Sequence, residues 1–299
     1  MFCLYRKPIK SDNIEAIFKT HGNIFSIAFC KAKNGIFYSS VSFNNISMLS
    51  LDNNENILYK EDDIVNPGSI CLNKNHTSVF FEDDFGGISG FTVDGIVMGM
   101  TGYSAKEDLK SSKNYSDTSR NNVVNTQKVN RISYIDKENI VVIAVPRKNI
   151  IRYLNNNGQL KKMIGSGKPD FALSGNIFNM AFNMPTSLVY WNKQDKLLIV
   201  DSNNHVVRTF RKDGEWKERE TIGIPLSEGH LDDKISQAKF SCPSEVCCFE
   251  NNVFVVDGSG TRVRKVDMDG VTTVYQTNDI IKSISCDSDN LYVLEYSEK

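Results

Sequence analysis

Two stretches of the chain repeat the same order of parts, and this repeat restricts the fold more than any other feature. Residues 181–223 and 238–276 each begin with Ala, Phe and Pro, followed by an apolar run, a polar break and a second apolar run that ends in Val-Asp. A loop, a strand containing Val-Arg, an Asp-Gly turn and a final strand complete each stretch. Four short β-rich runs separated by tight turns are typical of an antiparallel meander. A meander repeated at this period predicts a β-propeller.

The recurring landmarks of the two stretches resemble those of the NHL repeat. In the first stretch they are Ala181, Phe182, Pro185, Val200, Asp201, Asn204, His205, Val207, Arg208, Asp213 and Gly214. In the second stretch, which lacks the Asn-His pair, they are Ala238, Phe240, Pro243, Asp257, Val263, Arg264, Asp269 and Gly270. The resemblance is strong over residues 164–276 and weaker over 1–163. It implies a propeller that serves, like most NHL-like propellers, as a protein-interaction scaffold.

The remainder of the chain supplies further units of the same kind. Residues 22–63, 64–102 and 127–165 each give a whole blade, in addition to 181–223 and 238–276. Residues 278–299 and 1–21 each give half a blade, and we expect them to share one sheet because open strand edges are costly. Residues 103–126 are rich in Ser, Asn and Lys and are predicted to form a mobile, low-complexity loop. The prediction is a single all-β domain, residues 1–299, folded as a six-bladed β-propeller of four-stranded antiparallel blades.

Composition adds few constraints on function. The net charge of the 299 residues is −1, although residues 103–223 hold 20 Lys and Arg against 12 Asp and Glu. Seven cysteines show no C-x-x-C spacing, which favours reduced thiols over a disulfide framework. Neither a signal peptide nor an apolar run of membrane-spanning length is apparent in the sequence. We therefore predict a soluble, cytoplasmic, monomeric protein without a membrane partner.

The loops of such a propeller suggest where a partner binds. In a four-stranded blade, the loops between the second and third strands emerge at the same rim as the links between blades. Loops held on a rigid scaffold are the usual place for binding. We predict a partner-binding rim formed by Arg147, Lys148, Arg152, Lys168, Asn203, Asn204 and His205.

The first strand of each blade predicts the lining of the central channel. Alignment of these strands places six residues toward the axis: Ser26, Ser69, Arg131, Ser187, Glu245 and Ser283. We interpret the serines as small residues that fit a crowded axis, and a bridge between Arg131 and Glu245 as structural. Two further pairs bracket tight loops, Asp201 with Arg208 and Asp257 with Arg264, and are also predicted to be structural.

Residues for catalysis are hard to find in this pattern. Six-bladed propellers include metal-dependent hydrolases and lyases, which need several carboxylates or imidazoles on the axis. The predicted lining offers a single acid, Glu245, and the four histidines fall in turns, links or rim loops. We therefore predict no catalytic residue, no metal and no cofactor, and a non-catalytic scaffold that binds a protein partner through the loop rim. The alternatives are RNA binding through the basic rim of the third and fourth blades, and a metal-dependent hydrolase or lyase.

Overall fold

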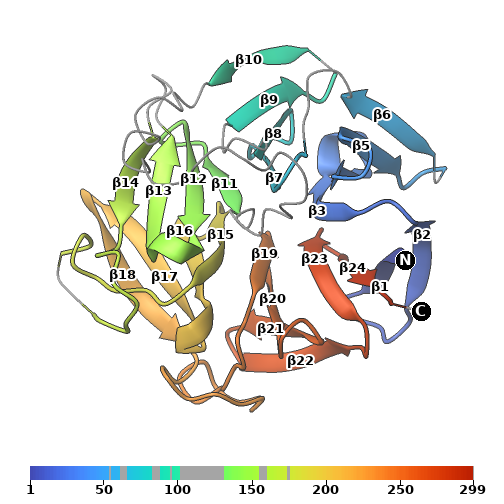
Figure 1. Ribbon diagram of the computed structural model, residues 1–299. Helices are drawn as coiled ribbons and strands as arrows, with labels where there is room; N and C mark the ends of the chain where they lie inside the picture. The colour runs from blue at the N-terminus through green and yellow to red at the C-terminus, as the bar shows by residue number, and fades with distance from the viewer. Residues whose placement is uncertain are drawn as a thin grey trace, which may run out of the picture.

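The protein forms a ring of six four-stranded antiparallel sheets around a central axis (Figure 1). The computed structural model describes residues 1–53, 55–60, 66–82, 88–94, 96–101, 131–154, 160–173 and 176–298. This arrangement confirms the predicted all-β, six-bladed propeller. The predicted loop 103–126 lies outside the described residues.

The first three blades come from the N-terminal half of the chain. Blade 1 contains β3 (Ile24–Cys30), β4 (Gly35–Ser40), β5 (Asn45–Ser50) and β6 (Asn56–Lys60). Blade 2 contains β7 (Ile70–Leu72), β8 (Ser78–Glu82), β9 (Ile88–Thr92) and β10 (Val97–Thr101). Blade 3 contains β11 (Ile132–Ile135), β12 (Ile140–Val145), β13 (Ile150–Leu154) and β14 (Leu160–Ile164).

Blades 4 and 5 carry the two repeats recognised in the sequence, and blade 6 joins the two ends of the chain. Blade 4 contains β15 (Pro185–Trp191), β16 (Lys196–Asp201), β17 (Val206–Asp213) and β18 (Glu215–Ile222). Blade 5 contains β19 (Glu245–Phe249), β20 (Asn252–Asp257), β21 (Arg262–Asp267) and β22 (Gly270–Gln276). Blade 6 contains β23 (Ile280–Cys286), β24 (Asn290–Tyr296), β1 (Phe2–Pro8) and β2 (Glu15–Thr20).

The ring closes through blade 6, in which the strand order is β2-β1-β24-β23. Strand β1 pairs antiparallel with β24, from Phe2 opposite Tyr296 to Pro8 opposite Asn290. The C-terminal segment therefore supplies the two inner strands and the N-terminal segment the two outer strands. This closure by the two termini confirms the sequence-based prediction.

The hydrophobic core lies between the blades. Six clusters of buried apolar side chains are present among the described residues, and each combines residues from two neighbouring blades. Between blades 3 and 4, for example, Val142 and Ile151 belong to the same cluster as Phe182 and Leu197. Each blade is thus stabilised by apolar burial against both neighbours. The pattern explains why the inner and middle strands are apolar on both faces.

Short helical turns that end on a left-handed residue occur at both ends of the strands, with Asn34 ending the turn after the first strand of blade 1. The short helical turns η3 (Pro146–Lys148) and η4 (Ser202–Asn204) both follow the second strand of a blade, and each ends on a left-handed residue, Asn149 and His205 respectively. Asn adopts this conformation more readily than most residues because its short side chain can bond locally. The turn η1 (Lys31–Lys33) instead follows the first strand of blade 1.

Candidate functional site

The ring has two faces, because antiparallel strands place alternate loops at opposite ends. The loop rim is the face that carries the loops between second and third strands, including 146–149, 202–205 and 258–261, together with the links 166–173 and 224–237. The mouth is the opposite face, formed by the loops between first and second strands: 31–34, 73–77, 136–139, 192–195, 250–251 and 287–289. The inner strands of the six blades surround the axis between these two faces.

The axial serines link neighbouring blades by hydrogen bonds. The Oγ atom of Ser26 accepts a bond from the backbone N–H of Ile70 in the next blade, at 3.3 Å. The same contact recurs around the ring for Ser69 with Ile132, Ser187 with Val246, and Ser283 with Ile27. All four serines are buried. They therefore satisfy backbone donors at the axis, where the sequence suggested only close packing.

Arg131 and Glu245 form an ion pair across the channel. The Nη2 atom of Arg131 lies 3.0 Å from Glu245 Oε2 and also donates to the Lys282 carbonyl at 3.0 Å. Ser283 Oγ donates to the other carboxylate oxygen at 2.9 Å. Burial raises the pKa of Glu245, an effect that Arg131 opposes. The Nη1 atom of Arg131 is buried and has no hydrogen-bond partner among the described residues.

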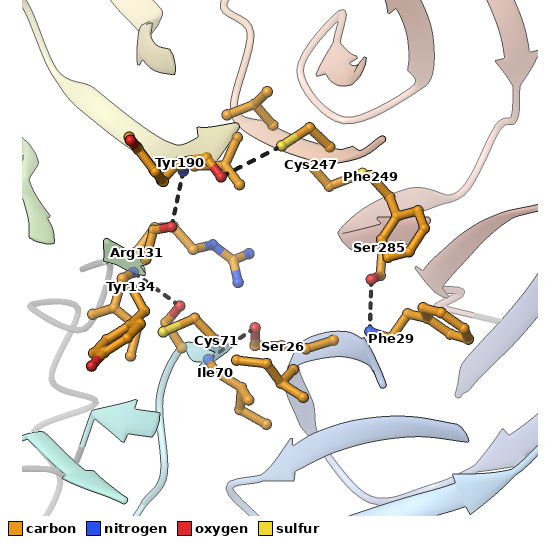
Figure 2. A pocket seen from close by; sticks show the side chains of 18 of the residues that line it. Ser26, Phe29, Ile70, Cys71, Arg131, Tyr134, Tyr190, Cys247, Phe249 and Ser285 are labelled. Carbon is orange, nitrogen blue, oxygen red and sulfur yellow. Dashed lines mark hydrogen bonds between the residues drawn. The ribbon is translucent and has the colours of Figure 1, made fainter. Parts of the chain in front are cut away.

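The channel widens from this ion pair toward the mouth. A cavity of about 150 Å³ is lined by the inner strands of blades 1 to 6, and the Arg131 guanidinium points into it (Figure 2). It continues into a wider pocket of about 680 Å³, which we call the mouth pocket. The mouth pocket is lined by Lys31, Ala32, Lys74, Asn75, His76, Tyr190, Trp191, Asn192, Lys193, Cys248, Phe249 and Glu250. Six of these residues also line the inner cavity: Lys74, His76, Tyr190, Asn192, Cys248 and Phe249.

His76 stands where the cavity and the mouth pocket meet. Its Nδ1 atom accepts a hydrogen bond from the backbone N–H of Lys31, at 3.0 Å. Its ring packs edge-on against Phe29 and Phe249, with centroids 6.3 and 5.8 Å away. Burial lowers the pKa of His76 below the ordinary 6.5, so the ring is neutral at pH 7. Because Nδ1 accepts a bond, the proton of the neutral ring is on Nε2.

The cysteines around the channel are not candidate nucleophiles. Burial raises the pKa of Cys247 and Cys248 well above the ordinary value, so both thiols stay protonated. Cys247 lies beside Cys286 of the next blade, with the two Sγ atoms 3.6 Å apart. No group of three or more His, Cys, Asp or Glu side chains in the described part of the chain could hold a metal ion.

The residues predicted for the loop rim differ widely in exposure. Arg147, Lys148, Lys168 and Asn203 are exposed, and Arg152 is half-buried. Asn204 is fully buried and donates to Asp201 and to the Asp170 carbonyl, which removes it from any binding surface. His205 is half-buried, and its Nδ1 accepts from the Cys242 N–H at 3.1 Å. RNA binding by this rim stays a prediction.

The two Asp-Arg pairs lie beneath the loop rim. Arg208 and Arg264 are fully buried, and their Nη1 atoms lie 3.3 Å from Asp201 and 2.8 Å from Asp257. Arg208 also forms a two-point contact with Glu218, at 2.8 and 2.7 Å. Burial raises the pKa of Asp201 to about 6. These contacts join the middle strands to the loops above them.

Sequence reasoning missed the mouth pocket. His76 was assigned to a turn, which is correct, but nothing in a single sequence separates it from other turn histidines. Lys31, Lys74 and Lys193 follow the first strands of blades 1, 2 and 4, and the alignment of those strands could have brought them together. The longer loops lie on the opposite face, so loop length does not point to this pocket.

Comparison with known proteins identifies the fold but no family. No family model matches the chain, and no curated protein sequence matches it. A solved structure of a nidogen/laminin complex matches 100% of this chain and 100% of its own, with a TM-score of 0.61 and 13% identity. A gluconolactonase from Xanthomonas campestris matches 93% of this chain and 88% of its own, with a TM-score of 0.59 and 11% identity. Virginiamycin B lyase from Staphylococcus aureus matches 99% and 100%, with a TM-score of 0.55 and 12% identity.

These structures correct the functional prediction. The sequence ranked a non-catalytic scaffold first, but the solved structures that share the fold include a lactonase and a lyase. That ranking was wrong, and the enzymatic alternative is the better supported one. The NHL resemblance itself stays a prediction. No helix within the described ranges is long and apolar enough to cross a membrane.

Proposed function

We propose that the protein is an enzyme of the lactonase or lyase type that acts on a small molecule bound in the mouth pocket. The observation that carries the proposal is His76, a neutral imidazole held between the inner cavity and the mouth pocket. The lactonase and the lyase that share the fold support this class of reaction. The volume of the pocket, about 680 Å³, falls in the usual range for small-molecule sites.

His76 suits the role of an electrophile. With Nδ1 bonded to the Lys31 N–H, the Nε2–H is the remaining polar group of the ring. A neutral imidazole can donate this hydrogen to a substrate carbonyl oxygen as negative charge develops there. Such charge develops both when water adds to a lactone and when a proton is removed beside a carbonyl. One donor therefore serves either reaction.

A metal-dependent version of this chemistry does not fit the described residues. Glu245, the acid of the axial lining, is occupied by Arg131 and Ser283. The described side chains form no cluster of three or more ligands around the channel. We therefore assign no step to a metal ion.

A turnover screen with two histidine variants tests the proposal. The purified chain is incubated with a panel of lactones and with esters that can undergo elimination, and acid release or product formation is followed. We expect His76→Gln to lower kcat about 100-fold, the usual loss for one oxyanion donor. His21→Gln is the matched control, because His21 is exposed and lies outside the pocket. Equal turnover by the two variants, or no turnover of any panel member by the wild type, would contradict the proposal.

A further inference from the structure

We infer that the mouth pocket binds a small anion with a flat apolar body, such as a carboxylate or a phosphate monoester carried on an aromatic ring. This inference rests on the proposed function, since it names the substrate class of the same site. It is carried by three features of the pocket: unpaired cations, an aromatic wall, and a buried donor at the inner end.

The cations come from three different blades. Lys31, Lys74 and Lys193 are all exposed and line the mouth pocket, whose acidic lining residue is Glu250. Their Nζ atoms form no ion pair or hydrogen bond with any residue that the structure describes. The lining thus has a local excess of positive charge, although the whole chain has a net charge of −1. Such a concave cluster attracts anions.

Lysines close to those of the pocket form ion pairs with carboxylates of the chain. Lys33 lies 2.8 Å from Asp94, and Lys137 lies 2.7 Å from Asp195. Lys33 is two residues from Lys31, and Lys137 lies in the corresponding loop of blade 3. Carboxylates of the chain neutralise both lysines. The three lysines of the pocket lack such partners, which is the arrangement expected where the ligand itself supplies the negative charge.

The wall beside these lysines is aromatic and already fixed in orientation. The Trp191 indole Nε1–H donates to the Glu250 carbonyl at 2.5 Å, and the Tyr190 hydroxyl donates to Asp195. Phe249 packs edge-on against Phe29, with ring centroids 6.0 Å apart. Because the polar atom of Trp191 is engaged, its ring is left to contact an apolar, flat group, whereas the Tyr190 ring is buried in the core between blades 3 and 4.

The inner end of the cavity adds a further donor. Arg131 Nη1 is buried without a partner among the described residues, and the guanidinium points into the cavity (Figure 2). A buried donor left unpaired costs free energy that a bound acceptor recovers. His76 therefore lies between the exposed lysines of the mouth pocket and the buried Nη1 donor of Arg131, which is unpaired within the described ranges. An anionic substrate gains a contact at both ends, whereas a cationic one would be repelled by the lysines.

Tryptophan fluorescence gives a direct test that does not require turnover. Trp191 lines the mouth pocket, whereas Trp216, the other tryptophan of the chain, does not. Phenyl phosphate, benzoate, inorganic phosphate and benzyl alcohol are titrated into the protein at low and high NaCl. We expect the two ring-bearing anions to change the fluorescence of Trp216→Phe and not that of Trp191→Phe. Their relative affinities distinguish a phosphate from a carboxylate substrate.

Two triple variants with equal charge changes locate the anion. The mouth variant removes the three cations of the mouth pocket and combines Lys31→Gln, Lys74→Gln and Lys193→Gln. The rim variant removes three cations of the loop rim and combines Arg147→Gln, Lys148→Gln and Lys168→Gln. We expect the mouth variant to weaken phenyl phosphate binding about tenfold, as three exposed charge contacts would give. The rim variant should bind within about twofold of the wild type, since its three positions are screened from the pocket.

The possible results test the anion, the aromatic ring and the enzymatic function separately. Benzyl alcohol binding as tightly as phenyl phosphate, or equal affinity in the two triple variants, would overturn the anion inference. Tight binding of inorganic phosphate alone would overturn the part that concerns the aromatic ring. Anion binding at Trp191 with no turnover of any substrate would support this inference while rejecting the proposed enzymatic function, so the two failures are distinguishable.

Discussion

The loop rim and the mouth use polar side chains in opposite ways. Beneath the loop rim, Arg208 and Arg264 are fully buried, and the carboxylates opposite them are satisfied by bonds to the chain. At the mouth, the charges of Lys31, Lys74 and Lys193 have no partner among the described residues. The Asp and Arg residues that recur in blades 4 and 5 are therefore bonded within the chain, whereas the three lysines of the mouth pocket are exposed and unpaired in the described part of the chain.

The comparison shows how a repeat sequence misleads about function. The landmarks shared by blades 4 and 5 build the same structure twice. In each blade the Arg bonds the Asp that ends the second strand, and its guanidinium lies over a buried Phe ring. The distance from Cζ to the ring centroid is 4.7 Å for Arg208 and Phe182 and 5.2 Å for Arg264 and Phe240. Residues that recur in every unit tend to support the unit itself. Residues that differ between blades, such as His76 and Arg131, are better candidates for a site on the axis.

The largest effect should follow from breaking a rim pair. Arg208→Met removes the cation between Asp201 and Glu218 and leaves Asp201 buried and unpaired. We expect a loss of about 3–5 kcal/mol in the free energy of unfolding. Urea denaturation followed by circular dichroism measures it. Lys148→Met, on the exposed part of the same rim, should stay within about 0.5 kcal/mol of the wild type. A similar cost for the two variants would show that the rim pairs are not structural.

The ion pair in the channel should give a smaller effect that depends on pH. Arg131→Met leaves Glu245 with burial and no opposing cation, so the pKa of Glu245 rises further. A carboxyl group with a raised pKa in the folded state stabilises it at low pH, and this contribution is lost as the pH rises through that pKa. We therefore expect the variant to lose about 3 kcal/mol at pH 7 and less at pH 5.

The double variant sharpens this second test. Arg131→Met combined with Glu245→Leu removes both charges and should recover most of the stability, because an apolar pair of similar size avoids desolvation. Thermal and urea unfolding at the two pH values compare the three proteins. A double variant as unstable as Arg131→Met, or a single variant without pH dependence, would show that the pair is not coupled as described.

The fold could be predicted from the sequence because it depends on local, repeated signals. Turn residues, apolar runs and the Asp-Gly corners of residues 181–223 and 238–276 define a blade, and counting such units gave six. Closure followed from the half units at the two ends, since Phe2 and Tyr296 belong to the strand of each half unit that would otherwise be left as an open edge. The axial positions Arg131 and Glu245 also followed, because the alignment of first strands fixes which residues face inward.

The site could not be predicted in the same way. The mouth pocket combines residues from blades 1, 2, 4 and 5, and its depth depends on how far the inner strands separate. The availability of Lys74 or Lys193 depends on which carboxylates reach them in space, which sequence spacing does not reveal. Asn204 illustrates the reverse error: a polar loop residue that looks exposed in the sequence is buried as a hydrogen-bond donor.

The smallest expected effect concerns the serines that link the inner strands. Ser187→Ala removes the acceptor of the Val246 N–H, a bond of 3.3 Å in a fully buried setting. We expect a loss of about 1 kcal/mol in the free energy of unfolding, since a buried donor is left unsatisfied. The site of the loss should be local: hydrogen exchange of the Val246 amide should accelerate, while that of Ile132, whose acceptor is Ser69, should not. If the serines only filled space, Ala would fit as well, and neither the stability nor the exchange of Val246 would change. A measurable change confined to one blade interface would instead show that each serine bond holds its own pair of neighbouring blades together.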